Sequence, residues 1–189
     1  MKKRNLSKLF LVLLTVVLLT GCNEKETENI NQSVPAKEDT IIESSAGTEK
    51  IEIPTEDIEG LQKITCSREA TGEDDSDVEL NYELYVDGDY IQILHSMEEI
   101  ITDDQDILDE YENAYKGIYE HYKDLEYYDT SVIRTENSVT NDTVINYGKI
   151  DTDKLLEIEG EEDNVIKDGK VKLDDWIDFA EQFGTECDN

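Results

Sequence analysis

The sequence predicts an α+β fold: an antiparallel sheet of about five strands, with a long amphipathic helix and a C-terminal helix packed on one face. Alternating apolar and polar residues predict strands from about residue 61 onward. Apolar residues at helical spacing predict a long helix over residues 107–125. The order strand, strand, strand, helix, strand, strand, helix favours an antiparallel sheet with its helices on one side.

Five segments have the pattern of strands. They are Leu61–Arg68, Val78–Val86, Tyr90–Met97, Tyr127–Thr135 and Thr143–Tyr147. Asp87 and Gly88 favour a tight hairpin turn between the second and third strands. The polar stretch Glu136–Asp142 is expected to connect the last two.

The long helix has a clear start and one apolar face. Thr102 and Gln105 form a capping-box pattern before it. Its apolar positions fall within an arc of roughly 140°; they are Ile107, Leu108, Tyr111, Ala114, Tyr115, Ile118, Tyr119, Tyr122 and Leu125. We expect these tyrosines to pack on the sheet; the alternative is an aromatic platform for a ligand.

Two further helices are expected near the C-terminus. Asp151 is placed to cap a short helix through Ile158. The apolar face of the last helix is formed by Leu173, Trp176, Ile177, Ala180 and Phe183. Gly184 suits the left-handed cap that ends it.

The N-terminus has the organisation of an export signal. Four basic residues precede an eleven-residue apolar segment, Leu9–Leu19, which is too short for a typical membrane span. Thr20 and Gly21 then lead into Cys22, which resembles the lipobox of bacterial lipoproteins. The resemblance implies lipid on Cys22, removal of residues 1–21, and a protein anchored in the cell membrane facing outside the cytoplasm. A plain secretory signal is the alternative.

Composition divides the rest of the chain in two. Residues 22–60 hold both prolines and no aromatic residue, and they predict a flexible acidic tether. Residues 61–189 hold all ten tyrosines and the single tryptophan, and they predict one domain.

The charge excludes some partners. Without residues 1–21, 13 basic residues face 48 acidic ones, a formal net charge of −35. Such a chain repels nucleic acid phosphates and anionic lipid headgroups. Glu73, Asp74, Asp75 and Asp77 could offer oxygen ligands to calcium, but the spacing of an EF-hand is absent. We expect a solvated loop, with no metal site and no cofactor.

Two cysteines are left besides Cys22. Cys66 and Cys187 form an even pair in a chain that is expected to be exported, so we expect a disulfide between them. The alternative is a reactive or metal-binding thiol, which would need a nearby histidine or a second cysteine at short spacing.

The sequence carries no pattern of a known catalytic site. Its two histidines are His95, on a strand, and His121, on the polar edge of the long helix. Glu98 and Glu99 lie near His95 in sequence, but single histidines are more often structural or solvated. We therefore expect that the protein is not an enzyme.

The part of the chain from about Leu61 to Cys187 resembles the YehR-like family of small bacterial lipoproteins. The resemblance rests on the Asp87–Gly88 hairpin, the tyrosine-rich helix, the segment Asn146–Asp151 with Leu155 and Leu156, and the closing segment Trp176–Gly184. It implies an α+β domain on a lipid anchor. It implies no activity and no site residues.

Together these features predict a lipid-anchored lipoprotein of the cell envelope that acts by binding or scaffolding. Its partner would be an envelope protein or a small ligand. The alternative is a carrier or sensor for a small ligand or a divalent cation. A carrier needs a concave pocket with converging polar groups, whereas a scaffold needs an exposed apolar patch.

Overall fold

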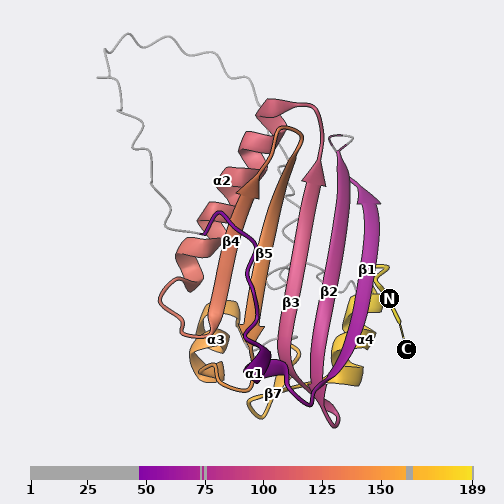
Figure 1. Cartoon of the computed structure of the whole chain (residues 1–189), viewed down its shortest axis with the longest axis vertical. Helices are drawn as coiled ribbons and strands as arrows, with labels where there is room; N and C mark the ends of the chain where they lie inside the picture. The colour runs from indigo at the N-terminus through magenta and orange to yellow at the C-terminus, as the bar shows by residue number, and fades with distance from the viewer. Residues whose placement is uncertain (1–46, 73, 75, 161–163, 189) are drawn as a thin grey trace, which may run out of the picture.

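An antiparallel sheet forms the centre of the molecule (Figure 1). The computed structural model describes residues 47–72, 74, 76–160 and 164–188. In this part of the chain the sheet has eight strands, in the order β4-β5-β3-β2-β1-β8, with the β6–β7 hairpin joined to β3. The long strands are β1 (Gln62–Thr71), β2 (Asp77–Asp87), β3 (Tyr90–Ile101), β4 (Tyr128–Arg134) and β5 (Ser138–Asn146). The short ones are β6 (Ile166–Lys167), β7 (Lys170–Lys172) and β8 (Glu186–Cys187).

The fold is α+β, as expected, but the sheet is larger than the five strands that we predicted. The three additional strands have two or three residues each, too few for an alternating pattern to show in the sequence. β3 also runs four residues beyond the expected Met97. Ile100 there lies between Val78 of β2 and Val139 of β5, so pairing on both sides extends the strand.

The expectation that Glu136–Asp142 is a connection is wrong for its last five residues, which begin β5. Val139 points to the core and is fully buried, whereas Asp142 is buried on the opposite face. Polar residues at buried positions hide the strand pattern, because their partners come from distant parts of the chain.

Four helices accompany the sheet in the described residues. They are α1 (Thr55–Ile58), α2 (Gln105–Tyr122), α3 (Thr152–Glu159) and α4 (Leu173–Glu181). α2 and α4 lie behind the sheet in Figure 1. Leu108 and Tyr115 of α2 and Trp176 of α4 belong to one hydrophobic core with strand residues such as Leu84 and Leu94. We call this side of the sheet the inner face.

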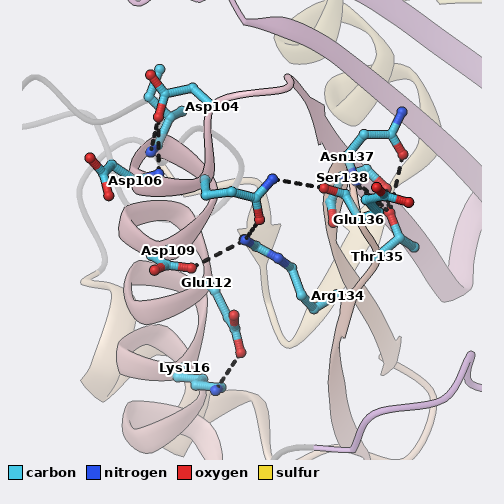
Figure 2. A network of polar contacts seen from close by, with 12 residues as sticks. Asp104, Asp106, Asp109, Glu112, Lys116, Arg134, Thr135, Glu136, Asn137 and Ser138 are labelled. Carbon is cyan, nitrogen blue, oxygen red and sulfur yellow. Dashed lines mark hydrogen bonds and ion pairs between the residues drawn. The ribbon is translucent and has the colours of Figure 1, made fainter.

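The start of α2 is tied to β4 (Figure 2). Asp104, rather than the expected Thr102, caps the helix, and its carboxylate accepts hydrogen bonds from the first turn. Arg134 of β4 donates to Gln105 Oε1 at 2.9 Å and lies 3.1 Å from Asp109 Oδ1. The helix ends at Tyr122, before the expected Leu125.

Residues 47–61 form a segment that we call the strap. It begins at the edge of β4, where the N–H of Val132 donates to Gly47 at 2.9 Å, and it reaches β1 at Leu61. In Figure 1 it crosses in front of the sheet, on the side that we call the outer face. Its apolar side chains pack on a small cluster of that face; the residues in contact are Ile51, Ile53, Ile58, Leu61, Tyr85, Ile93 and Val144. Residues 47–60, which composition assigned to the tether, thus lie against the sheet.

The expected disulfide between Cys66 and Cys187 is confirmed. It joins directly opposed residues of β1 and β8 and so fixes the C-terminal strand to the sheet. Within the described ranges, no helix is both long enough and apolar enough to span a membrane.

Candidate functional site

A buried histidine–carboxylate pair lies between the sheet and the strap. His95 Nε2 of β3 lies 2.6 Å from Asp142 Oδ1 of β5. The second carboxylate oxygen, Oδ2, accepts a hydrogen bond of 2.8 Å from the backbone N–H of Ile51. His95 is 5% exposed and Asp142 is 0% exposed. The pair therefore holds the strap on the sheet, and the strap closes it off from solvent.

Glu83 of β2 extends this pair toward the edge of the sheet. Its Oε2 lies 3.8 Å from His95 Nδ1 and accepts a hydrogen bond of 2.8 Å from the hydroxyl of Tyr85. Its Oε1 lies 2.8 Å from the ammonium of Lys63. Burial alone would raise the pKa of Glu83, but the hydrogen bonds from Lys63 and Tyr85 outweigh it, and the pKa lies below its usual value. These contacts link the strap to the sheet and its strands to one another.

Glu98 and Glu99 do not form a site with His95. Side chains alternate along a strand, so Glu98 points to the inner face, away from the histidine. Burial raises the pKa of Glu98 to about 7, and the positive charge of Arg68 opposes the rise. The hydroxyl of Tyr115 interacts with the Glu98 carboxyl, which opposes the rise in the pKa of Glu98 and adds to the rise in the pKa of Tyr115 that burial causes. Glu99 lies on the same face as His95 but four residues along β3, roughly 13 Å away.

A cleft of about 590 Å³ opens at the edge of the sheet along β4, and we call it the tyrosine cleft. Four segments line it: the beginning of the strap, the C-terminal end of α2, the connection after α2 and the first residues of β4, with Tyr119, Tyr127 and Tyr128 among the lining residues. Tyr127 is 46% exposed, and its φ of 68° is left-handed, a conformation that costs a non-glycine residue about 1 kcal/mol. Backbone strain of this kind is concentrated at functional positions.

The polar lining of the tyrosine cleft is largely unpaired. In the described part of the chain, Glu49, Lys50, Glu126 and Asp129 form no ion pair, whereas Lys123 lies 2.6 Å from Glu120. Ser131, 1% exposed, also lines the cleft, and its hydroxyl has no partner among the described residues. The unpaired charges are thus available to a bound molecule.

A second cleft, of about 390 Å³, lies beside the disulfide. Its lining includes Ser67, Asn81 and Met97 of the outer face, and Glu186 and Asp188 of the C-terminal segment. It has no exposed aromatic ring, and Asp188 already accepts a hydrogen bond from Thr65. We regard the tyrosine cleft as the better candidate site.

The structure describes only some of the predicted site residues. Cys22, the signal segment 1–21 and the tether up to residue 46 lie outside the described residues, as do Glu73 and Asp75 of the acidic loop. In that loop Asp74 accepts hydrogen bonds from Ser76. Among the residues that the structure describes, no three His, Cys, Asp or Glu side chains are grouped to hold a metal ion.

The predicted tyrosine stripe is divided between core and cleft. Tyr115 and Tyr122 are buried, and Tyr111 packs against the core in part. Tyr119 lines the tyrosine cleft instead. Sequence analysis missed this cleft because one wall comes from residues assigned to the tether. The adjacent pair Tyr127 and Tyr128, directly after the helix, is the signal that could have drawn attention to it.

Comparisons with known proteins give little further information. No family model matches the chain, and no curated protein matches it. An NMR structure of a protein from Streptococcus pneumoniae TIGR4 is 12% identical, with a TM-score of 0.47, and the match covers 89% of this chain and 99% of that chain. No function follows from this similarity.

Proposed function

We propose that this chain is a lipid-anchored binding protein on the outer side of the cell membrane, and that it holds its ligand in the tyrosine cleft. The basic N-terminus, the apolar segment and Cys22 support the anchor. The resemblance to YehR-like lipoproteins belongs to this proposal. The proposal also includes the arrangement of the helices: α2 and α4 form one layer on the inner face, and neither covers the edge of β4.

The observation that carries the proposal is the tyrosine cleft itself. Its volume of about 590 Å³ lies in the range typical of ligand sites, roughly 300 to 1,000 Å³. It combines an exposed aromatic ring with unpaired charges, the mixture that orients a bound molecule. A scaffold would instead need a broad apolar patch. On the described residues only Tyr90 and Tyr127 are large apolar side chains that stand exposed.

The proposal includes no catalysis. His95 is buried against Asp142, and that carboxylate also holds Ile51 of the strap. A histidine in this position supports structure, because a general base must reach its substrate directly or through one water.

The site would lie close to the point where the chain arrives from the membrane. Gly47, the first described residue, lines the tyrosine cleft. Residues 23–46 connect it to Cys22 and can span at most roughly 80 Å. A ligand of the membrane surface or of the adjacent wall is therefore within reach.

Two measurements test the two parts of the proposal. Cells fed an alkyne analogue of palmitate should label the wild-type protein and not Cys22→Ser. Normal labelling of the variant, or an unmodified N-terminus elsewhere in the chain, would overturn the anchor.

For the binding part, the full chain can be labelled with 3-fluorotyrosine and titrated with a low-molecular-mass extract of the cell envelope. The ¹⁹F resonances of Tyr119 and Tyr127 should shift, and that of the exposed Tyr90 should stay. No shift at any tyrosine, or a shift at Tyr90 alone, contradicts binding in the tyrosine cleft.

A further inference from the structure

The protein itself places an ammonium group beside the tyrosine cleft. Lys149 Nζ lies 5.7 Å from the centre of the Tyr127 ring and forms an ion pair with Asp57 of the strap. The faces of an aromatic ring carry negative charge and attract a cation. Tyr127 is still 46% exposed, so Lys149 leaves part of this residue open to a second cation.

The charges that line the cleft favour the same kind of group. The carboxylates of Glu49, Glu126 and Asp129 have no ion-pair partner among the described residues. Of the two lysines in the lining, Lys50 is unpaired in that part of the chain, whereas Lys123 already has a carboxylate partner. Three unpaired carboxylates thus stand against one unpaired ammonium, an arrangement that attracts a cation and repels an anion.

Two of these carboxylates come from different walls of the cleft, Glu49 from the strap and Asp129 from β4. Asp129 pairs with Val144 in the register of β4 and β5, and Val144 belongs to the outer-face cluster on which the strap packs. Residues directly opposite in an antiparallel pair share a face, so Asp129 lies on the face that the strap crosses. A cation between the two walls is therefore attracted from both. The formal net charge of −31 for the whole chain attracts cations over a longer range.

We propose that the tyrosine cleft binds a small organic cation, with an ammonium group over the exposed part of Tyr127 and in contact with Glu49 and Asp129. This inference rests on the proposed function and specifies the chemical class of its ligand. The arrangement repeats the one that holds Lys149, an ammonium between an aromatic ring and a carboxylate of the strap. The carboxylates select the charge, and the ring adds an attraction of its own.

Three five-carbon compounds with different end groups test the selection of charge. 1,5-Diaminopentane carries two ammonium groups, pentane-1,5-diol is uncharged, and glutarate carries two carboxylates. Each is titrated into the full chain labelled with 3-fluorotyrosine, at about 0.15 M salt, where attraction beyond about 8 Å is largely screened. The ¹⁹F resonance of Tyr127 should shift in a saturable way with the diamine, with an affinity about tenfold higher than for the diol, and glutarate should give no shift. Equal affinities for the diamine and the diol would contradict the inference.

Tyr90 separates binding in the cleft from binding to any exposed tyrosine. It is 39% exposed and has Lys170 over its ring at 4.9 Å, much as Tyr127 has Lys149, but it lies outside the cleft. Its resonance should therefore not move with the diamine. Tyr127→Leu should weaken diamine binding about fivefold in calorimetric titrations, and Tyr90→Leu should leave it unchanged. Equal effects of the two substitutions would overturn the placement of the ammonium at Tyr127.

Matched charge variants locate the site. Glu49→Gln with Asp129→Asn should weaken diamine binding about tenfold. Asp103→Asn with Glu181→Gln makes the same change in net charge at exposed positions outside the cleft, and it should have little effect. Equal weakening by both pairs would show diffuse attraction to an acidic protein and overturn the inference.

The outcomes also separate this inference from the proposed function. If the envelope extract shifts the tyrosine resonances of the cleft but the diamine does not bind, the site stands and an organic cation is the wrong ligand class. If neither binds, both proposals fail.

Discussion

Single buried residues carry much of the polar architecture. Asp142 is fully buried and serves two donors on different segments, His95 of β3 and the backbone of Ile51. Glu98 is on the opposite face of the sheet, where burial raises its pKa to about 7. For each of these two residues, we predict the effect of a single substitution on stability.

Asp142→Ala should destabilise the domain by about 2 to 4 kcal/mol, because it leaves two buried donors without an acceptor. The amide of Ile51 should also exchange faster with solvent, since the strap loses its hydrogen bond. Chemical denaturation and hydrogen exchange measure the two effects. The control is Asp129→Ala, an exposed carboxylate of the same face, which should cost less than about 0.5 kcal/mol. Equal stability of the two variants would refute the role given to Asp142.

Glu98 should make stability fall as pH rises. Its pKa increases from 4.5 in an unfolded chain to about 7 in the folded one, so the folded state retains a proton that the unfolded state releases. The free energy of unfolding should therefore decrease between about pH 4.5 and 7, with Glu159, whose pKa burial also raises to about 7, adding to the slope. Glu98→Gln should flatten this slope and stabilise the protein above pH 7. Glu110→Gln, at an exposed position of α2, matches the loss of one charge, and an equal flattening there would contradict the assignment.

At the scale of elements, α2 is stabilised mainly by the side that packs on the sheet. Its start is held by Arg134, and Tyr115 in its middle is fully buried, with its hydroxyl beside the Glu98 carboxyl. Lys116 and Glu112 pair on its surface at 2.6 Å (Figure 2), a contact of a kind that contributes only a few tenths of a kcal/mol.

Tyr115→Ala should cost about 3 to 5 kcal/mol, since it removes a buried aromatic ring. Tyr115→Phe keeps the ring and removes only the hydroxyl that interacts with Glu98, so it should cost much less, about 1 kcal/mol. Asn113→Ala at an exposed position of the same helix is the control. Thermal denaturation compares the three, and an unchanged melting temperature for Tyr115→Ala would mean that the tyrosine belongs to a ligand platform.

The elements also show what the sequence could and could not predict. Alternation placed β2 within one residue at each end, because its polar residues face solvent and its apolar residues face the core. It failed for the first half of β5, where Asp142 is buried by contacts from β3 and the strap. The strap was missed because its three isoleucines are spread through an acidic, proline-containing segment. The tyrosine cleft could not be predicted, since it needs the strap, α2 and β4 to meet.

At the scale of the whole molecule, the Cys66–Cys187 disulfide joins the first strand of the sheet to the last, 121 residues apart. Reduction should lower the free energy of unfolding by about 4 to 5 kcal/mol, because an open chain gains more entropy on unfolding. Denaturation with and without reductant measures the change. The double variant Cys66→Ser with Cys187→Ser should not respond to reductant. Coincident curves for the reduced and oxidised wild type would show that the disulfide adds no stability.

The central claim is that this protein binds its ligand at the tyrosine cleft while anchored in the membrane. Tyr127 and Tyr90 provide a matched test, because both are exposed, by 46% and 39%, and each has a lysine over its ring. A photoreactive phenylalanine at either position can be activated in intact cells. The account predicts a covalent adduct of defined mass at position 127, lost on competition with the ligand, and none at position 90. Adducts of equal yield at both positions, or at position 90 alone, would contradict it.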